Sequence, residues 1–572
     1  MECKEKILSE EYVDGVVDFP VERVIREGDD ICYIPLSDRY YVAYQNRFIS
    51  PDLSGSTYQY QYVPNLYGLM QMEVGGGTIF DPSSLVSSGI RQLQGQPLNL
   101  RGRGVVIAII DTGIEYQNQA FLDSNGESRI LAIWDQTVQE GTPPEGFVFG
   151  SEYTRTDINR ALASQEPLTI VPTTDPLRHG TIMAGIAAGS AVGGGNRYLG
   201  AAPEADIVVV KLKEAKQYLR EYYFVPEGVA AYQENDIMLG IAYANQFAID
   251  FRRPVVICLG IGTNMGDHAG NSFLGKYMDS IAVQRSRAVV VCGGNEGIAN
   301  HHYTWTFPTR EEQVDYRDVE IRVGEGEKGF LLEFWGSLPD LFNISVRSPG
   351  GETIPPIRLG VEQMNTYGFI FEDTRVTVQS VLVEPGSGEE FFLFRFESPT
   401  PGIWTFRVTT IGEVHNGVFH MWLPITQFLS STTYFLEASP DTTITEPAMA
   451  SEIICVTNYN HVNNSFYLES GRGFSRTGKI RPDLAAPGVN VPTLYGNRTG
   501  SSLSAAITAG GVAQFMQWAV VEGNSPLAES REVRNYFIQG ANRMPGRTYP
   551  NREWGYGALN VLGVFERLRG DV

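Results

Sequence analysis

The stretch Asn497-Arg498-Thr499-Gly500-Ser501-Ser502-Leu503-Ser504-Ala505-Ala506-Ile507-Thr508-Ala509-Gly510-Gly511 predicts a tight turn that runs directly into a helix of small and apolar residues. Gly500 has no Cβ and so allows a sharp bend. A serine in the first turn of this helix lies beside N–H groups that have no intrahelical partner, where the helix dipole favours negative charge. Such a position suits a serine alkoxide and a stabilised oxyanion, but on this stretch alone it does not distinguish a nucleophile from a cap. The alternative is that Ser501 or Ser502 only caps the helix.

The length and the net charge of the chain limit its number of domains and the kinds of partner that it binds. Its 572 residues predict about two to four domains. The 44 basic and 66 acidic residues give a net charge of −22, which argues against nucleic acid or an anionic membrane surface as the main partner. The sequence contains no apolar run of about 18 residues, so we expect no membrane span. The N-terminus carries no apolar signal segment, so we expect synthesis in the cytosol, after which the protein stays there or leaves by assembly into a larger structure or by cell lysis.

The cysteines predict neither a disulfide framework nor a zinc site, because the five are scattered and form no CxxC pair. Cys258 and Cys292 end apolar runs, which indicates buried thiols. The sequence shows no P-loop, no dinucleotide fingerprint, and no acidic loop with convincing calcium-ligand spacing. We therefore expect neither a cofactor nor a bound metal.

Residues 1–80 form the first expected unit, a small α+β module. Strands are predicted near residues 12–20, 30–36 and 40–44. The glycine-rich segment 73–80 follows, and its composition is typical of a linker or a cleavage region. The alternative is an ordinary surface loop.

The next expected unit, residues 81–308, alternates buried strands with helices and predicts a doubly wound parallel sheet. Asp111 ends the strand predicted at residues 104–113, on the carboxyl edge where α/β folds place ligands. His179 begins a helix of small residues. The other predicted strands lie at 205–212, 254–262 and 288–297, and the other predicted helices at 235–247 and 279–285.

An all-β insertion interrupts this alternation at residues 309–440. Alternating strand patterns separated by turn signals predict a β-sandwich or jelly roll. Trp335 and Trp404 lie on predicted strands, and carbohydrate binding through them is a further alternative to burial in a core. The α/β pattern resumes near Ser451, so residues 441–572 complete the unit begun at residue 81.

Four motifs stand in one order along the chain: Asp111-Thr-Gly, His179-Gly-Thr, Gly293-Gly-Asn-Glu-Gly297 and Gly500-Ser-Ser502. Together they resemble the subtilisin-like serine proteases (subtilases), over residues 80–308 and 440–565. The catalytic residues of subtilisin also follow one another as Asp, His and Ser along its chain. Within the motif, Ser502 keeps the nucleophile's register, whereas the neighbouring Ser501 and Ser504 do not.

The resemblance implies roles for single residues. Ser502 is the nucleophile, His179 accepts its proton and returns it to the leaving amine, and Asp111 orients the imidazole. Asn295 donates its side-chain amide to the oxyanion beside the Ser502 N–H. The implied substrate-binding residues are Cys258, Leu259 and Gly260, as the edge that pairs with substrate, and Cys292, Gly293 and Gly294, on the wall of the S1 pocket. Ser501, Ala506 and Ile507 depart from secreted subtilases, which usually carry Thr, Pro and His there.

Finer details resemble the clostridial Csp-type subtilases, proteases of spore germination. They are the segments 129–136 and 259–268, the helix after Ser502 and the β insertion. The resemblance implies an N-terminal prodomain that acts as an intramolecular chaperone and stays bound. It also implies a jelly roll that rigidifies the catalytic domain, a protein substrate of the class of cortex-hydrolase proenzymes, and a spore-associated location. We expect self-cleavage between Met70 and Asp81. The alternative is a non-catalytic sensor or scaffold on a protease fold, with the prodomain retained.

Overall fold

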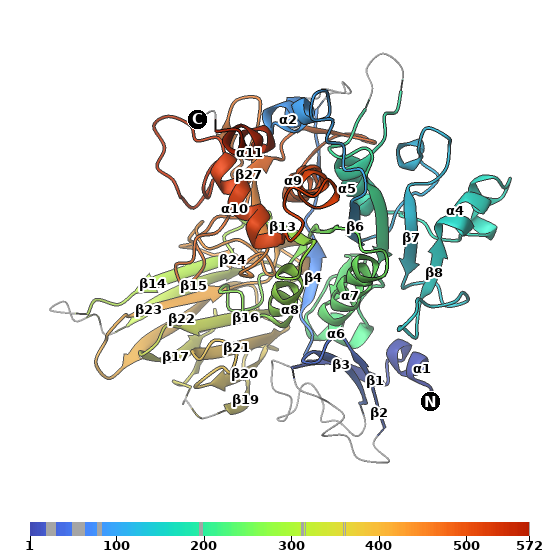
Figure 1. Ribbon diagram of the computed structural model, residues 1–572. Helices are drawn as coiled ribbons and strands as arrows, with labels where there is room; N and C mark the ends of the chain where they lie inside the picture. The colour runs from blue at the N-terminus through green and yellow to red at the C-terminus, as the bar shows by residue number, and fades with distance from the viewer. Residues whose placement is uncertain are drawn as a thin grey trace.

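The computed structural model describes residues 1–18, 30–47, 63–76, 83–193, 198–309, 314, 316–357, 360 and 362–570. A central α/β unit carries a β-sandwich on one side and a small N-terminal domain on another (Figure 1). Across the described part of the chain, no helix combines the length and the apolar character needed to cross a bilayer.

The α/β unit is built on a mixed sheet with the strand order β26-β25-β13-β11-β6-β9-β7-β8, in which β27 also pairs with β25. Neighbours from β25 to β7 run parallel, while β8 and β26 at the two ends run antiparallel. The expected parallel α/β sheet is therefore present, with antiparallel edges that the sequence did not predict. The strands are β6 (Val106–Asp111), β7 (Ile130–Asp135), β8 (Ser151–Thr154), β9 (Asp206–Lys211), β11 (Val255–Leu259), β13 (Arg287–Cys292), β25 (Ile454–Asn460), β26 (Ser465–Phe466) and β27 (Leu484–Pro487).

Helices cover both faces of this sheet. Along β6, Ile107 and Ile109 point into the core shared with α5 and α9, while Ala108 and Ile110 point into the core shared with α7 and α8. Because successive side chains of a strand alternate between faces, a strand with two covered faces is apolar throughout. The helices are α2 (Ser83–Ser87), α3 (Ile90–Leu93), α4 (Arg155–Leu162), α5 (His179–Ala188), α6 (Gln217–Tyr222), α7 (Glu234–Asp250), α8 (Phe273–Ala282), α9 (Ser501–Met516), α10 (Ser530–Gly540) and α11 (Val561–Leu568).

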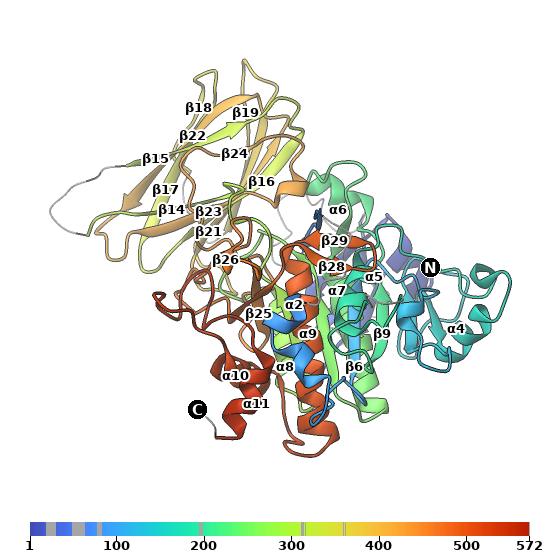
Figure 2. The ribbon, with the colours of Figure 1, turned by 90° about the horizontal axis from the view of Figure 1, so that it is seen from above.

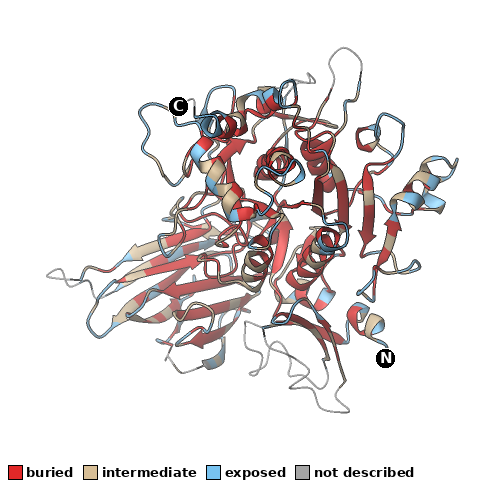
Figure 3. Ribbon diagram, in the orientation of Figure 1, coloured by how far each residue is buried: buried red, intermediate tan, exposed pale blue. Residues whose placement is uncertain are grey.

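Every residue of helix α9 is buried (Figure 3), as is every residue of α5. Small residues make this position possible. A Cβ on Gly510 would lie 2.3 Å from the Cβ of Ala201, and a Cβ on Gly511 would lie 2.8 Å from Val561. The small-residue composition of the helix is therefore explained by close packing on both sides.

The β-sandwich consists of two facing antiparallel sheets with the orders β14-β23-β16-β21-β20-β19 and β18-β17-β22-β15-β24 (Figure 2). Its first strand begins at His302, ahead of the expected boundary at residue 309. The strands are β14 (His302–Thr306), β15 (Arg317–Val323), β16 (Gly329–Gly336), β17 (Leu341–Arg347), β18 (Thr353–Ile354), β19 (Glu362–Gly368), β20 (Arg375–Val381), β21 (Glu390–Glu397), β22 (Gly402–Ile411), β23 (Val418–Trp422) and β24 (Tyr434–Phe435).

The tryptophans considered for carbohydrate binding are buried. Trp404 is 0% exposed and packs edge-on against Phe396 inside the sandwich. Trp335 is 1% exposed and packs against Phe391. The carbohydrate-binding alternative is therefore wrong for these two side chains, because neither presents a ring face to solvent.

A stack of aromatic rings joins the sandwich to the α/β unit. His268, from the loop after β12 (Ile261–Gly262), stacks on Trp422 of β23 with 4.2 Å between ring centroids. His302 stacks on Trp422 and on His420, and its Nε2 lies 3.0 Å from Nδ1 of His420. Burial lowers the pKa of His268 to about 4 and that of His302 to about 3, so these imidazoles are neutral packing groups at pH 7.

The N-terminal domain contains α1 (Cys3–Leu8) and a sheet of β1 (Tyr12–Val17), β2 (Ile31–Pro35) and β3 (Tyr41–Asn46) in the order β1-β3-β2. It packs on α7 and α8, where Tyr40 meets Tyr277 edge-on at 5.8 Å. The strands predicted in this region are present at the positions described.

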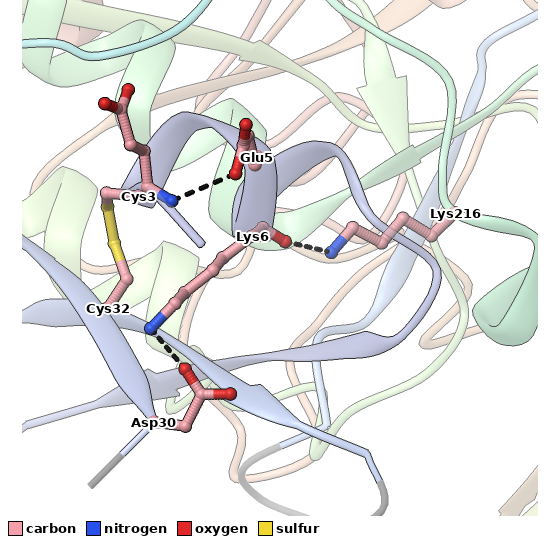
Figure 4. Close-up of a disulfide and its surroundings, with 7 residues drawn as sticks. Cys3, Glu5, Lys6, Asp30, Cys32 and Lys216 are labelled. Carbon is pink, nitrogen blue, oxygen red and sulfur yellow. Dashed lines mark hydrogen bonds and ion pairs between the residues drawn. A yellow bond between two sulfur atoms is a disulfide. The ribbon is translucent and has the colours of Figure 1, made fainter. Parts of the chain in front are cut away.

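One feature of this domain differs from the sequence prediction. Cys3 of α1 and Cys32 of β2 form a disulfide, with their Cα atoms 5.5 Å apart (Figure 4). The expectation that the chain has no disulfide is therefore wrong. The pairing arises because α1 packs against β2, which also brings Lys6 to 2.5 Å from Asp30. Cys258, Cys292 and Cys455 are buried free thiols, as expected for the first two.

Candidate active site

Asp111, His179 and Ser502 meet at the carboxyl edge of the central sheet. Asp111 ends β6, His179 begins α5, and Ser502 lies in the first turn of α9. His179 Nδ1 lies 2.8 and 2.9 Å from the two carboxylate oxygens of Asp111, and His179 Nε2 lies 3.0 Å from Ser502 Oγ. All three side chains are buried. The structure thus brings the three predicted residues into one hydrogen-bonded chain.

The buried carboxylate of Asp175 sets the position of His179. It accepts hydrogen bonds from the N–H groups of Arg178 and Thr181, each at 2.9 Å, and thereby satisfies donors at the start of α5. It also accepts one from Thr112 Oγ1 at 2.7 Å, directly after Asp111 in the chain. Asp175 therefore ties the end of β6 to the beginning of α5. No sequence pattern pointed to this residue.

Gly500 is required for a different reason from the one the sequence suggested. Its φ is 161°, which is extended backbone that any residue adopts. However, a Cβ on Gly500 would lie 2.8 Å from the carbonyl oxygen of Gln71. The glycine is therefore needed for close approach of another segment and not for a sharp bend. Ser504 donates to the carbonyls of Ala486 and Pro487, so its hydroxyl is occupied in packing.

The electrostatic environment of His179 favours its protonated form. Burial lowers the pKa of His179, but the charge and hydrogen bond of Asp111, together with the Met70 carbonyl, outweigh burial and raise that pKa above 6.5. A stabilised imidazolium is what a general base needs after it has taken a proton from a hydroxyl.

The side-chain amide of Asn295 is held in one orientation. Its Oδ1 accepts from the Ser501 N–H at 3.1 Å, and this leaves Nδ2 to point into the cleft. Nδ2 donates to the carbonyl oxygen of Gln71 at 3.0 Å. The side-chain amide of Asn295 therefore lies beside the first turn of α9 and binds the carbonyl oxygen of Gln71, a residue of the same chain.

The residues before and after Gln71 fill the cleft as an extended peptide. On one side, β4 (Leu66–Leu69) lies between β10 (Ala231–Gln233) and β12 (Ile261–Gly262) and pairs antiparallel with both. On the other side, β5 (Glu73–Val74) pairs with β29 (Gly496–Thr499), which in turn pairs with β28 (Val491–Thr493). Strand addition of this kind holds a peptide through its backbone.

The hydroxyl of Ser502 reaches this peptide between the two strands. It donates to the carbonyl oxygen of Met70 at 2.8 Å, and His179 Nε2 lies 3.2 Å from the same oxygen. The covalent chain from the N-terminal domain thus passes directly over the three residues. The sequence predicted cleavage in this region, but it did not mark Met70 or Gln71 as residues of the site.

The predicted substrate-binding residues fall into two groups. The Gly260 carbonyl accepts from the Met70 N–H at 3.0 Å, so Gly260 contacts the bound segment. The side chains of Cys258, Leu259 and Cys292 are fully buried, and burial raises the pKa of the Cys292 thiol to about 12. The backbones of Gly293 and Gly294 bond to Val456, Thr445 and Gly471. The second group, all the predicted residues other than Gly260, therefore lies behind the cleft. Among the contacts described, these residues make no hydrogen bond to the bound segment.

A cavity of about 300 Å³ adjoins Asn295 and the bound segment. Gln427 lines it and bonds to the segment twice: its Nε2 donates to the Leu69 carbonyl at 3.0 Å, and its Oε1 accepts from Gln71 Nε2 at 3.3 Å. Gln427 lies in the short helical turn η5 (Thr426–Phe428) that follows the last long strand of the sandwich. No sequence pattern marked it, because it follows an insertion and belongs to none of the four motifs.

This arrangement has the parts that acyl transfer requires: a hydroxyl, a base within hydrogen-bonding distance, a group that orients the base, and an amide donor beside the nucleophile. Among the described residues, no group of three or more His, Cys, Asp or Glu side chains is placed to hold a metal ion.

Comparisons with known proteins identify the family of this chain. The model of the subtilase family matches residues 102–316 and 430–557. The structure of the CspB protease of Clostridium perfringens is 29% identical, with a TM-score of 0.76, over 86% of this chain and 98% of that one. MycP1, a serine protease of the type VII (ESX-1) secretion system, is 14% identical, with a TM-score of 0.36, over 87% and 93% of the two chains. A search of curated proteins gave no match.

The family match is interrupted between residues 316 and 430, which covers most of the sandwich, and this is how a domain inserted into the α/β unit appears in such a comparison. The similarity to CspB extends over nearly all of that chain. The chain belongs to the subtilase family of serine endopeptidases.

Proposed function

We propose that this protein is a subtilisin-like endopeptidase that first cleaves its own chain in the segment around Gln71 and then cleaves another protein. The observation that carries the proposal is the position of residues 66–74, which pass through the cleft as an extended strand with one carbonyl at Ser502 and the next at Asn295. A segment held in this way has the backbone conformation that proteases bind in a substrate.

In the proposed reaction, His179 removes the proton of the Ser502 hydroxyl through Nε2, and the oxygen attacks a backbone carbonyl carbon. Asp111 holds the tautomer of His179 that makes this possible and stabilises the imidazolium. The negative charge that develops on the carbonyl oxygen is stabilised by the amide of Asn295. His179 then gives its proton to the leaving amine. Water, activated by the same base, hydrolyses the acyl-enzyme and restores Ser502.

We place the cut between Gln71 and Met72. The Gln71 carbonyl already accepts a hydrogen bond from Asn295, which is the donor proposed for the oxyanion. Glu73 pairs with Thr499, so the residues after Met72 are held as a leaving strand. The competing bond is Met70–Gln71, because Ser502 Oγ bonds to the Met70 carbonyl. Both bonds lie within the region expected from the sequence. Sequencing of the new N-terminus separates them, since it begins at Met72 in the first case and at Gln71 in the second.

The N-terminal domain fits the role of a prodomain that assists folding and remains bound after the cut. It shares a core with α7 and α8, and its Asp14 carboxylate receives hydrogen bonds from Lys216 and Gln233 of the α/β unit at 2.5 and 2.6 Å. While Leu66–Leu69 occupies the strand position between β10 and β12, another protein has no access to that position. Departure of the domain would therefore open the cleft.

A role in spore germination is the more specific part of this proposal. It rests on the similarity to the CspB protease over 86% of this chain. By the resemblance to Csp-type subtilases, the β-sandwich would be the inserted jelly roll that rigidifies the catalytic domain. The substrate would be the proenzyme of a cortex-lytic hydrolase, and the protein would be associated with the spore.

The alternative is a non-catalytic sensor or scaffold in which the N-terminal domain permanently fills the cleft. The arrangement of Ser502, His179, Asp111 and Asn295 favours the enzyme, since a scaffold has no need of a base at 3.0 Å from a buried hydroxyl. The observation that favours the scaffold is that residues 66–74 of the chain itself occupy the cleft.

Intact mass analysis of the wild type and the Ser502→Ala variant tests the proposal. We expect two fragments from the wild type, with a cut after Gln71, and one uncut chain from the variant. The wild type alone should react with a fluorophosphonate probe once the N-terminal fragment is displaced. A single full-length chain for both proteins, with no labelling of either, would support the scaffold.

A further inference from the structure

The cleft has a narrow point over Gly68. We name the subsites from the proposed cut after Gln71. Gln71 is then P1, and Gly68, three residues earlier in the chain, is P4. A Cβ built on Gly68 would lie 1.7 Å from Nε2 and 2.8 Å from Cδ of Gln427, and 2.6 Å from Cδ1 of Ile425. The three nearest obstacles thus belong to two side chains of one segment, although Gly68 is paired with β10 and β12.

Glycine is needed at position 68 because there is no room for a side chain, and not because of the backbone conformation. The φ of Gly68 lies outside the left-handed region where side chains are strained, and Gly68 belongs to a regular antiparallel strand. An alanine would therefore fit the backbone without strain. It would fail only because Gln427 and Ile425 occupy the volume of its methyl group.

Gln427 cannot move aside without loss, because its position is fixed on both sides. Its own amide bonds to the Leu69 carbonyl and to Gln71 Nε2. The preceding residue, Thr426, donates its N–H and its hydroxyl to the carboxylate of Glu296 at 3.1 Å each. His301 Nδ1 lies 2.9 Å from the same buried carboxylate. Ile425 is 1% exposed and packed in the core.

Glu296 directly follows Asn295 in the chain, so one short segment places both the amide at Gln71 and the carboxylate that anchors the turn of Gln427. We infer that Gln427, supported by Ile425, makes this protease selective for glycine at P4, both in its own cut and in the protein substrate that it cleaves afterwards. The substrate class is then an extended segment whose residue three positions before P1 carries no side chain.

A double-mutant cycle on self-cleavage tests this inference. Wild type, Gly68→Ala, Gln427→Ala and Gly68→Ala/Gln427→Ala are made by cell-free synthesis, and the uncut chain is followed over time on gels. We expect Gly68→Ala to slow the cut about ten-fold when Gln427 is present, since displacing Gln427 loses one or two hydrogen bonds. With alanine at position 427, the end of the Ile425 side chain can shift into the space that Gln427 leaves, so glycine and alanine at position 68 should be cut at rates within about three-fold of each other.

Gly76→Ala is the matched control. Gly76 lies in the same segment, and nothing lies within 4 Å of a Cβ built there. This variant should be cut at the wild-type rate. Thermal midpoints of Gly68→Ala and of the double variant, both in a Ser502→Ala background, show whether folding is affected. A lower midpoint that Gln427→Ala restores supports the same clash.

Equal cutting of wild type and Gly68→Ala would overturn the inference and leave the proposed function intact. Slow cutting of Gly68→Ala that Gln427→Ala does not relieve would also overturn it. If the wild type itself stays whole, the proposed function fails, and the inference falls with it.

Discussion

The ammonium nitrogen of Lys216 lies 2.5 Å from a carboxylate oxygen of Asp14, and both side chains are shielded from solvent. This pair joins the N-terminal domain to the α/β unit, and the Tyr12 carbonyl accepts a second hydrogen bond from Lys216 at 3.0 Å. A buried charge that loses its partner is strongly destabilising, whereas a pair replaced as a whole is less so. The contact between the two parts of the chain therefore depends on both charges.

Asp14→Ala should weaken the hold on the N-terminal fragment after the cut. The unpaired Lys216 costs about 3–5 kcal/mol, so size-exclusion chromatography of the cleaved protein should show the fragment leaving at lower urea than in the wild type. Asp14→Asn/Lys216→Met should retain the fragment better than Asp14→Ala. Asp18→Ala breaks an exposed pair with Arg39 and should change the result by less than about 1 kcal/mol. Wild-type retention by Asp14→Ala would contradict the role of the pair.

Asn295→Ala should slow self-cleavage without unfolding the protein. Loss of one oxyanion donor typically costs about 2.7–4 kcal/mol of transition-state stabilisation, or about 10²–10³ in rate. Time courses of uncut chain measure the rate, and thermal unfolding in the Ser502→Ala background measures the stability. A rate within a few-fold of the wild type would show that the Gln71 carbonyl is not the one attacked.

The rate of self-cleavage should fall on the acidic side with an inflection above pH 6.5. His179 must be neutral to accept the Ser502 proton, and its pKa is raised because Asp111 and the Met70 carbonyl outweigh the effect of burial. The rate is therefore lost as the pH decreases through this raised pKa. Cell-free protein shifted into buffers from pH 5 to 9 gives the profile. An inflection at or below 6.5 would contradict the assignment of His179 as the base.

Glu446→Gln should stabilise the protein at alkaline pH. Burial raises the pKa of Glu446 to about 8, with Asp267 and Glu234 adding to the effect and the Gly270 N–H and the Ser272 hydroxyl opposing it. Between pH 4.5 and 8 the folded state holds this proton and the unfolded state does not, so this group lowers stability as the pH increases. At pH 9 the variant should be more stable than its parent by about 5 kcal/mol, because each unit of the shift from 4.5 to about 8 is worth about 1.4 kcal/mol.

Urea unfolding of Ser502→Ala, with and without Glu446→Gln, at pH 5 and pH 9 measures this difference. At pH 5 the two proteins should be nearly equal, because Glu446 is protonated in the folded state and an amide resembles a neutral carboxyl group. A difference of the same size at both pH values would show that the substitution acts through packing and not through the proton.

The sequence predicted most of what lies close to the four motifs. Asp111, His179 and Ser502 carry flanking glycines whose purpose is close approach, and such glycines leave a local pattern: a Cβ on Gly180 would lie 2.3 Å from the Gly113 carbonyl. The continuous apolar run of β6 likewise predicted a strand covered on both faces.

Features that depend on contacts between distant segments were not predictable. Cys3 and Cys32 carry no pairing signal of their own, and their disulfide follows from how α1 packs on β2. Gln427 reaches the cleft only because the sandwich returns the chain there, 358 residues after Leu69. Gly500 was predicted to matter, but for a bend, since nothing in the sequence shows that Gln71 lies against it.

The nucleophile belongs to α9, which packs on β25 and β27, and all three follow the sandwich in the chain. A ribosome therefore completes the N-terminal domain, every strand of the central sheet and the whole sandwich before it makes Ser502. Under the proposed function, the bond after Gln71 stays intact until then, because the residue that would break it does not yet exist. The order of segments along the chain would thus delay the proposed cut until the sheet that carries the active site has been made.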